Sequence, residues 1–196
     1  MEYHRLDQHR KDLFTRVESG DYIGNIITDS NVCIRSASDR TLLHVAVIAG
    51  NLKNVEILVK KGKDKLVNMQ DNGGDTALAF VARYTGNTDI AKCMIEKTKW
   101  SDSQVSRENL LEIDNKEKVI PILLAAANGH KELTTYLYSK TPSKVFDGDD
   151  SQNRVLLLSL CINAEIFGKQ GFLCFLIIMV LSSVTHFSGY LISMCV

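Results

Sequence analysis

Apolar residues gather in short stretches that end in glycine, and the same arrangement occurs three times along the chain. The first stretch of each unit reads TLLHVAVIAGN at 41–51, TALAFVARYTGN at 76–87 and IPILLAAANGH at 120–130. The second reads LKNVEILVKKG at 52–62, TDIAKCMIEKT at 88–98 and KELTTYLYSKT at 131–141. Apolar residues three and four positions apart in the second stretches, such as Val55, Leu58 and Val59, form one buried stripe per helix. The pattern predicts units of two short helices.

Particular residues mark where the first helix of each unit should begin and end. Thr41 and Thr76 stand where an N-cap hydroxyl can accept a hydrogen bond from the first turn, and Pro121 stands where a first-turn proline is tolerated. The closing residues should be left-handed, with positive φ: Gly50, Gly86 and Gly129. We therefore expect Gly129→Val to strain the third unit and lower its melting temperature. The second unit has one extra residue before its glycine, which predicts a bulged helix or a longer turn.

The rest of the chain fits around these units. Residues 11–30 read as a helix pair around Gly20, and residues 153–167 read as the first helix of a unit that is not completed. The predicted organisation is a capping helix pair at 1–38, repeats at 39–70, 71–98 and 119–145, a polar insertion at 99–118, an incomplete repeat at 146–167 and a hydrophobic tail at 168–196. A short helical turn is expected near 109–113 within the insertion.

Composition narrows the range of functions. Lys plus Arg and Asp plus Glu each number 23, so the formal net charge is zero and gives no electrostatic case for nucleic-acid binding. The charged segment 1–12 does not read as a secretory signal peptide. Five cysteines show no metal or redox spacing, and nothing pairs a nucleophile with a base. We predict no enzyme activity, no cofactor, no metal site and no small-molecule substrate.

Two polar motifs resemble binding loops only in part. FDGDDSQN at 146–153 lacks calcium-loop residues, because Gln152 stands at the sixth position where glycine is required and Leu158 at the closing position where glutamate is required. DNGGDT at 71–76 has neither a preceding strand nor a following phosphate-loop lysine. It reads instead as the hairpin that joins two repeats.

Residues 171–196 form an uncharged stretch of 26 residues, GFLCFLIIMVLSSVTHFSGYLISMCV. At 1.5 Å per residue, a helix of that length spans a hydrocarbon core of roughly 30 Å. We expect a membrane anchor here, with Lys169 at the cytosolic boundary. The alternative is a soluble core helix. The corresponding localisations are a plasma membrane or endomembrane with cytosolic repeats, or the cytoplasm.

The first unit resembles the ankyrin repeat, whose pattern is roughly T-P-L-H-x-A-A-x-x-G-H, through Thr41, Leu43, His44, Ala46 and Gly50. The resemblance implies that His44 bonds to neighbouring backbone and helps to fix the hairpin. In the other units the histidine is replaced, by Ala79 and by Leu123, which removes a polar tie in each. The predicted fold class is all-α: an ankyrin-repeat solenoid of helix pairs with hairpin loops, plus a C-terminal hydrophobic helix.

As a set, the stretches over about residues 10–167 are similar to the plant ankyrin-repeat membrane proteins of the accelerated-cell-death type, which carry a C-terminal PGG domain. That resemblance implies a cytosolic repeat region that binds proteins, a membrane domain, and roles in defence, cell-death and salt-stress signalling. After Phe167 the chain departs from the family pattern. Gly168-Lys169 is what a read-through splice donor of the GGTAAG kind would encode, so the tail is either an anchor or a translated intron.

Three hypotheses follow from these observations. The chain is a non-catalytic interaction module tethered by its tail, or a component of a membrane assembly, or a truncated product with little activity of its own. In the first, the binding face lies on the concave side of the repeats, at the hairpin tips and the exposed ends of the first helices. Its predicted residues are Arg40, Ile48, Asp75, Arg83, Tyr84, Lys118 and Asn128.

Overall fold

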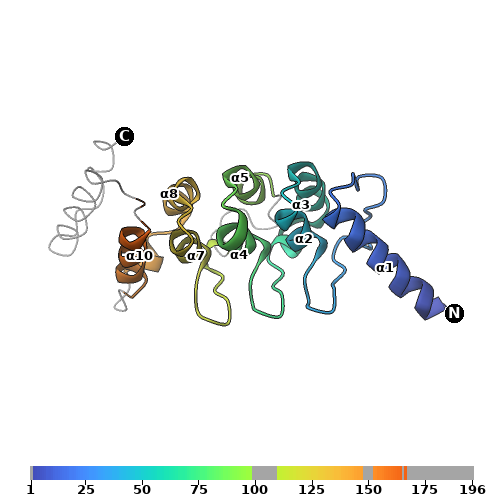
Figure 1. Ribbon diagram of the computed structural model, residues 1–196, viewed down its shortest axis with the longest axis horizontal. Coiled ribbons are helices and arrows are strands. Elements are labelled where there is room, and N and C mark those ends of the chain that lie inside the picture. The colour runs from blue at the N-terminus through green and yellow to red at the C-terminus, as the bar shows by residue number, and fades with distance from the viewer. Residues whose placement is uncertain (1, 99–109, 148–151, 165, 167–196) are drawn as a thin grey trace.

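Helix pairs stand in a row in the computed structural model, which describes residues 2–98, 110–147, 152–164 and 166 (Figure 1). The described helices are α1 (Glu2–Glu18), α2 (Leu42–Ile48), α3 (Leu52–Val67), α4 (Ala77–Phe80), the π-helix η1 (Val81–Thr85), α5 (Thr88–Glu96), α7 (Pro121–Ala127), α8 (Lys131–Lys140), α9 (Lys144–Asp147) and α10 (Gln152–Asn163). First helices α2, α4 and α7 form one row, and second helices α3, α5 and α8 form another. Three loops project from the side of the first helices.

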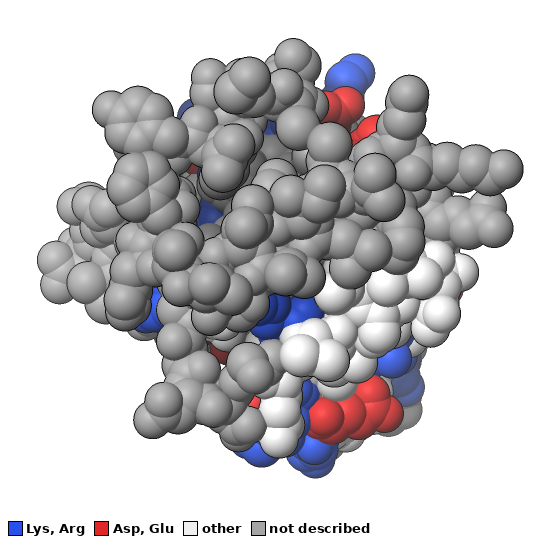
Figure 2. Space-filling model, turned by 90° about the vertical axis from the view of Figure 1, so that its left-hand side faces the viewer, with Lys and Arg blue, Asp and Glu red and all other residues white. Residues whose placement is uncertain are grey.

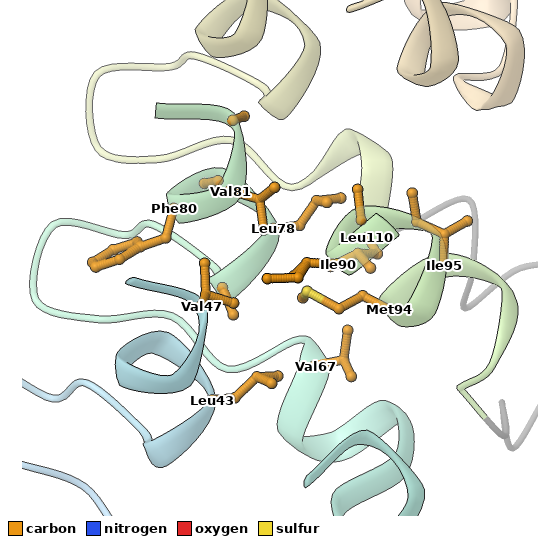
Figure 3. Close-up of a cluster of buried hydrophobic side chains, with 14 of the residues drawn as sticks. Leu43, Val47, Val67, Leu78, Phe80, Val81, Ile90, Met94, Ile95 and Leu110 are labelled. Atoms are coloured by element: carbon orange, nitrogen blue, oxygen red, sulfur yellow. The ribbon is translucent and has the colours of Figure 1, made fainter. Parts of the chain in front are cut away.

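The predicted solenoid of helix pairs is confirmed, and one continuous core holds its units together. Each unit packs on the next through both rows, α2 on α4, α3 on α5 and α5 on α8. Figure 3 shows how side chains from successive units meet: Leu43, Val47, Val67, Leu78, Phe80, Val81, Ile90, Met94, Ile95 and Leu110, each at most 1% exposed. A unit of two short helices cannot bury its apolar face alone, so stability comes from stacking.

The first helices begin and end as the sequence predicts. Thr76 Oγ1 accepts a hydrogen bond of 3.2 Å from the Ala79 N–H, and Pro121 is the first residue of α7. The three closing glycines are left-handed, with φ of 66° at Gly50, 62° at Gly86 and 71° at Gly129. At these positions the chain reverses without the penalty that a Cβ would bring.

The extra residue of the second unit is accommodated by a π-helix. η1 follows α4 directly, and the Gly86 N–H donates to the Val81 carbonyl at 2.8 Å, five residues back. The wider turn accommodates the extra residue, and Gly86 still lies where the chain reverses direction. The predicted bulged helix is therefore confirmed.

The expected helix pair around Gly20 was wrong in its second half. α1 ends at Glu18, and residues 21–34 run as turns and irregular backbone. Asn31 competes with helix formation there, because its Oδ1 accepts from the Thr28 N–H at 2.7 Å and its Nδ2 donates to the Ile26 carbonyl at 2.9 Å. Ile23 and Ile27 are buried although their backbone is not helical.

Beyond the third unit, α10 packs against α7 through Leu157 and Cys161, in the place of a next first helix. Residues 110–112 are helical, in agreement with the turn predicted near 109–113. Viewed from the α10 end, the described surface has an uncharged area bordered by both acidic and basic side chains (Figure 2). In the described ranges no helix is both long and apolar enough to cross a bilayer. The predicted anchor at 171–196 lies outside these ranges.

Candidate functional site

The three loops beside the first helices are hairpins of one geometry. In each, a backbone N–H donates to the carbonyl four residues later: Ser36 at 2.8 Å, Asp71 at 3.0 Å and Asn115 at 3.2 Å. The residue three positions after each of these is left-handed: Asp39 with φ 58°, Gly74 with φ 80° and Lys118 with φ 62°. Only one of these three positions carries glycine, the residue that tolerates this conformation best.

Lys118→Gly is expected to stabilise the protein by about 0.5–1 kcal/mol, because glycine removes the strain of a left-handed lysine. Lys118 is largely exposed, and its ion pair with Asp114 at 3.2 Å lies at the surface, where such pairs contribute little to stability. Lys116→Gly in the same loop is the control, since Lys116 does not have a positive φ and should lose stability. Thermal unfolding of both variants checks this. A loss of stability in Lys118→Gly would show that the left-handed tip does not form.

Neighbouring hairpins are tied to one another along the row. Arg35 Nη1 donates to the Gln70 carbonyl at 2.8 Å, and Gln70 Nε2 in turn donates to the Asp114 carbonyl at 3.0 Å. Two backbone hydrogen bonds of 3.1 Å run beside these, from Asn72 to Ser38 and from Lys116 to Gly73. The hairpins therefore form a connected surface rather than three independent loops.

His44 fixes the first hairpin to the second. Its Nδ1 accepts from the Thr41 backbone N–H at 3.1 Å, and its Nε2 donates to the Asp75 carbonyl at 3.0 Å. Because the Asp75 carbonyl can only accept and the Thr41 backbone N–H can only donate, the ring is neutral with its proton on Nε2. The ring is fully buried, and its edge meets Phe80 at 4.9 Å between centroids. This is the structural role that the repeat pattern implies.

Burial lowers the pKa of His44 below its ordinary value of 6.5, against the opposing effect of the hydrogen bond to the Asp75 carbonyl. Below pH 6.5 the unfolded chain binds a proton that the folded chain does not. The free energy of unfolding should therefore fall as the pH drops from 6.5 towards the folded-state pKa, by at most about 1.4 kcal/mol per pH unit from this residue. Urea unfolding of the wild type and His44→Gln between pH 5 and 8 measures this contribution. Equal slopes would contradict it.

Asp75 was predicted to bind a partner, and the structure corrects this. The residue is 8% exposed, and Oδ1 accepts from Asn115 Nδ2 at 2.9 Å. Its Oδ2 pairs with Arg83 Nη2 at 3.2 Å. Both carboxylate oxygens are used inside the protein, so this residue ties the second hairpin to the third where Ala79 has replaced the repeat histidine.

Arg83, which was also predicted to bind a partner, is largely engaged in contacts within the protein. Besides Asp75 it lies 3.6 Å from Glu117, and only 27% of its side chain is exposed. Arg83 therefore holds η1 against the second and third hairpins. Replacing it would change stability as well as any contact with a partner.

Tyr84, Ile48 and Asn128 are exposed at equivalent ends of three first helices. Tyr84 lies in η1 with 56% of its surface exposed, Ile48 is the last residue of α2 with 48% exposed, and Asn128 caps α7. The Asn128 amide donates to the Leu124 carbonyl at 2.8 Å, so part of its polar capacity is used locally. We call the surface formed by Arg40, Ile48, Tyr84 and Asn128 the loop-side face.

Phe80 brings the two strongest members of the loop-side face together. Tyr84 meets its ring edge-on at 5.3 Å between centroids, and the Arg40 guanidinium lies 5.1 Å from the centroid of the same ring. Arg40 also pairs with Asp71 at 3.7 Å. Sequence reasoning missed Phe80, Asn115 and Gln70. The polar residues Asp71 and Asn115 at equivalent hairpin positions were the signal that could have revealed the hairpin ties.

The described residues show little sign of other site chemistry. Within them, no three His, Cys, Asp or Glu side chains are grouped so that they could hold a metal ion. Burial raises the pKa of the Cys93 and Cys161 thiols to about 11, which keeps both protonated at neutral pH.

Comparison with known proteins agrees with this architecture. Residues 18–109 match the family model for ankyrin repeats (3 copies). Over 64 residues the chain is 42% identical to the Notch-regulated ankyrin repeat-containing protein of Xenopus tropicalis and 39% identical to that of Homo sapiens. Each alignment covers 33% of this chain and 54% of the relative. The chain thus spans about half the length of the curated relatives it matches.

A solved structure shows the same fold. A chain from the crystal structure of the yeast ribosomal protein Rps3 in complex with its chaperone Yar1 aligns with a TM-score of 0.53 at 20% identity. The alignment covers 68% of this chain and 93% of that one. The protein therefore has the ankyrin-repeat fold, with ankyrin repeats over residues 18–109. Ankyrin-repeat proteins are typically non-catalytic modules that bind other proteins.

Proposed function

We propose that this chain is a non-catalytic module that binds a protein partner through the loop-side face. The observation that carries the proposal is the position of Tyr84, which is 56% exposed yet packed edge-on against the buried ring of Phe80. Tyrosine and arginine are the residue types that most often dominate binding energy, and Arg40 rests on the same ring. A side chain held in place before binding loses less entropy when a partner covers it.

The double variant Ile48→Ser/Tyr84→Ala should lose at least one captured partner while the repeats stay folded. Both residues are exposed, so the change removes contact area but leaves the core intact. Tyr138→Ala is the matched control, because Tyr138 is an exposed aromatic residue on the second-helix row. Full-length baits followed by mass spectrometry measure recovery, and melting curves verify folding. If the wild type, the double variant and Tyr138→Ala all captured the same proteins, this face would be rejected as the binding surface.

We further propose that residues 171–196 tether the repeats to a membrane, with the repeats in the cytosol. The support is the uncharged 26-residue stretch beside a charged repeat region. The resemblance to plant accelerated-cell-death proteins suggests defence or stress signalling as the setting. Three alternatives remain: the segment takes part in a larger membrane assembly, the chain is cytoplasmic, or the segment is a translated intron in a product with little activity.

Alkaline carbonate extraction should leave the full chain in the membrane pellet, because a spanning segment is not released when peripheral contacts are broken. The control is a chain that ends at Phe167, which should become soluble. Release of the full chain into the supernatant would reject the anchor. A genomic sequence without a splice donor after Phe167 would reject the read-through.

A further inference from the structure

A shallow hollow of about 310 Å³ is lined mostly by residues of α3. This helix belongs to the row of second helices, on the side away from the three loops (Figure 1). It is lined by Tyr22, Lys53, Glu56, Ile57 and Lys60. Four of these residues belong to α3, and Tyr22 comes from the turn segment that follows α1. The hollow is therefore formed where the N-terminal segment meets the first complete repeat.

Buried contacts set the position of Tyr22 beside α3. Asn54 is fully buried, and its Nδ2 donates to the Asp21 carbonyl at 2.7 Å while its Oδ1 accepts from the Ile23 N–H at 3.3 Å. The two residues that flank Tyr22 are thus both held by one side chain. Tyr22 itself stays 64% exposed.

Gly24 lets the tyrosine ring fold back over the turn. A Cβ at position 24 would lie 2.2 Å from the Tyr22 Oη and 2.4 Å from its Cζ. Only a residue without a side chain permits this ring position. Asn54 therefore holds the backbone on both sides of Tyr22, and Gly24 leaves room for its exposed ring.

Most of the charged side chains around the hollow are positive, and the two lysines among them are free to pair with a ligand. Lys53, Ile57 and Lys60 lie at i, i+4 and i+7 of α3, which places them along one helix face. Glu56 pairs at 2.6 Å with Lys97, the C-cap residue of α5, so its carboxylate is already matched. In the part of the chain that the structure describes, neither Lys53 nor Lys60 takes part in an ion pair. Two ammonium groups on residues about 10 Å apart along the helix flank an apolar floor.

We propose that this hollow binds an acidic segment of a second protein partner. An apolar or aromatic side chain would enter the hollow against Tyr22 and Ile57, and carboxylates on either side would meet Lys53 and Lys60. Charge complementarity favours an acidic ligand, and the hollow favours a peptide with a side chain to insert over a flat anionic surface. A membrane would attract all the exposed lysines of α3 alike, including Lys63 and Lys65.

The test uses the full chain and the peptide EELFEE-amide with fluorescein on its N-terminal amine, and QQLFQQ-amide with the same label as the probe that lacks carboxylate side chains. Anisotropy titrations should give tighter binding of the Glu peptide, weakening as salt rises. Lys53→Gln/Lys60→Gln should weaken binding about five- to thirtyfold, from the loss of two exposed ion pairs. Tyr22→Ala should also weaken it. Lys63→Gln/Lys65→Gln removes the same charge from the same helix and should change binding less than about twofold.

Several results would overturn this proposal. One is that the wild type does not bind the Glu peptide, and another is that it binds the Gln peptide equally well. A third is that the two lysine double variants weaken binding to the same extent. Binding to phosphatidylserine vesicles without peptide binding would overturn it in favour of a membrane surface. Melting curves of every variant separate lost binding from lost folding. Since the hollow is remote from the loop-side face, failure here leaves the protein-binding role of Tyr84 in place.

Discussion

Gly86→Ala is expected to destabilise the protein by about 2–5 kcal/mol, the largest effect among the glycines that close the first helices. Gly86 has φ 62°, and an added Cβ would lie 2.4 Å from His130 Nδ1 and 2.6 Å from Cγ of the same ring. The substitution therefore adds a clash between two units to the strain of a left-handed alanine. His130 is the N-cap of α8, so moving it also disturbs the start of that helix.

Gly50→Ala is the matched control for this prediction. Gly50 has φ 66°, but nothing lies within 4 Å of the added Cβ, so only the backbone penalty of about 1–2 kcal/mol is expected. Gly129→Val should also lower the melting temperature, through strain at φ 71°, since its nearest neighbour is Ala164 at 4.0 Å. Urea unfolding of the three variants measures which of them loses the most stability. A Gly86 variant no less stable than the Gly50 variant would contradict the close approach of Gly86 to the His130 ring.

Asp75→Ala is expected to cost about 2–4 kcal/mol, because it removes the acceptor shared by two donors. Asn115 is 5% exposed and would lose the partner of its amide, and the Arg83 guanidinium would keep only Glu117 at 3.6 Å. The expected loss of stability is smaller than for a fully buried ion pair, because Arg83 is partly exposed. The second and third hairpins would lose the side-chain tie that replaces the repeat histidine.

Asp114→Ala provides the comparison for Asp75→Ala. The Asp114 side chain is 43% exposed and pairs with the exposed Lys118, so its removal should change stability by about 0.5 kcal/mol or less. Chemical denaturation of both variants distinguishes the structural carboxylate from the surface one. Similar small losses for both would mean that Asp75 is free to contact a partner, as the sequence first suggested.

The helix pairs could be predicted because their signals are local. Thr76, Pro121 and the three glycines each determine a helix start or reversal from the chemistry of one residue, so spacing alone places them. The extra residue before Gly86 gave the π-helix for the same reason. The second helix expected after Gly20 failed because the polar side chain of Asn31 favours turns over the apolar spacing of Ile23 and Ile27.

The binding surface was predicted less well, because it depends on contacts between residues far apart in the sequence. Asp75 and Asn115 are 40 positions apart, and no pattern in either stretch shows that they meet. Tyr84 and Arg40 were predicted because they lie at positions that the repeat pattern does not require, but their shared contact with Phe80 follows from how α4 packs against the first hairpin. Local spacing therefore gives the fold, while the available side chains are decided by packing.

Site-specific photo-crosslinking tests the central claim most directly. Two full-length variants are made, one with the photoreactive residue p-benzoylphenylalanine in place of Tyr84 and one with it in place of Tyr138. Each is irradiated in extracts of the source cells. The loop-side face predicts a discrete protein adduct from position 84 that is absent from position 138. Adducts of equal number and size from both positions, or none from position 84, would contradict partner binding at this face.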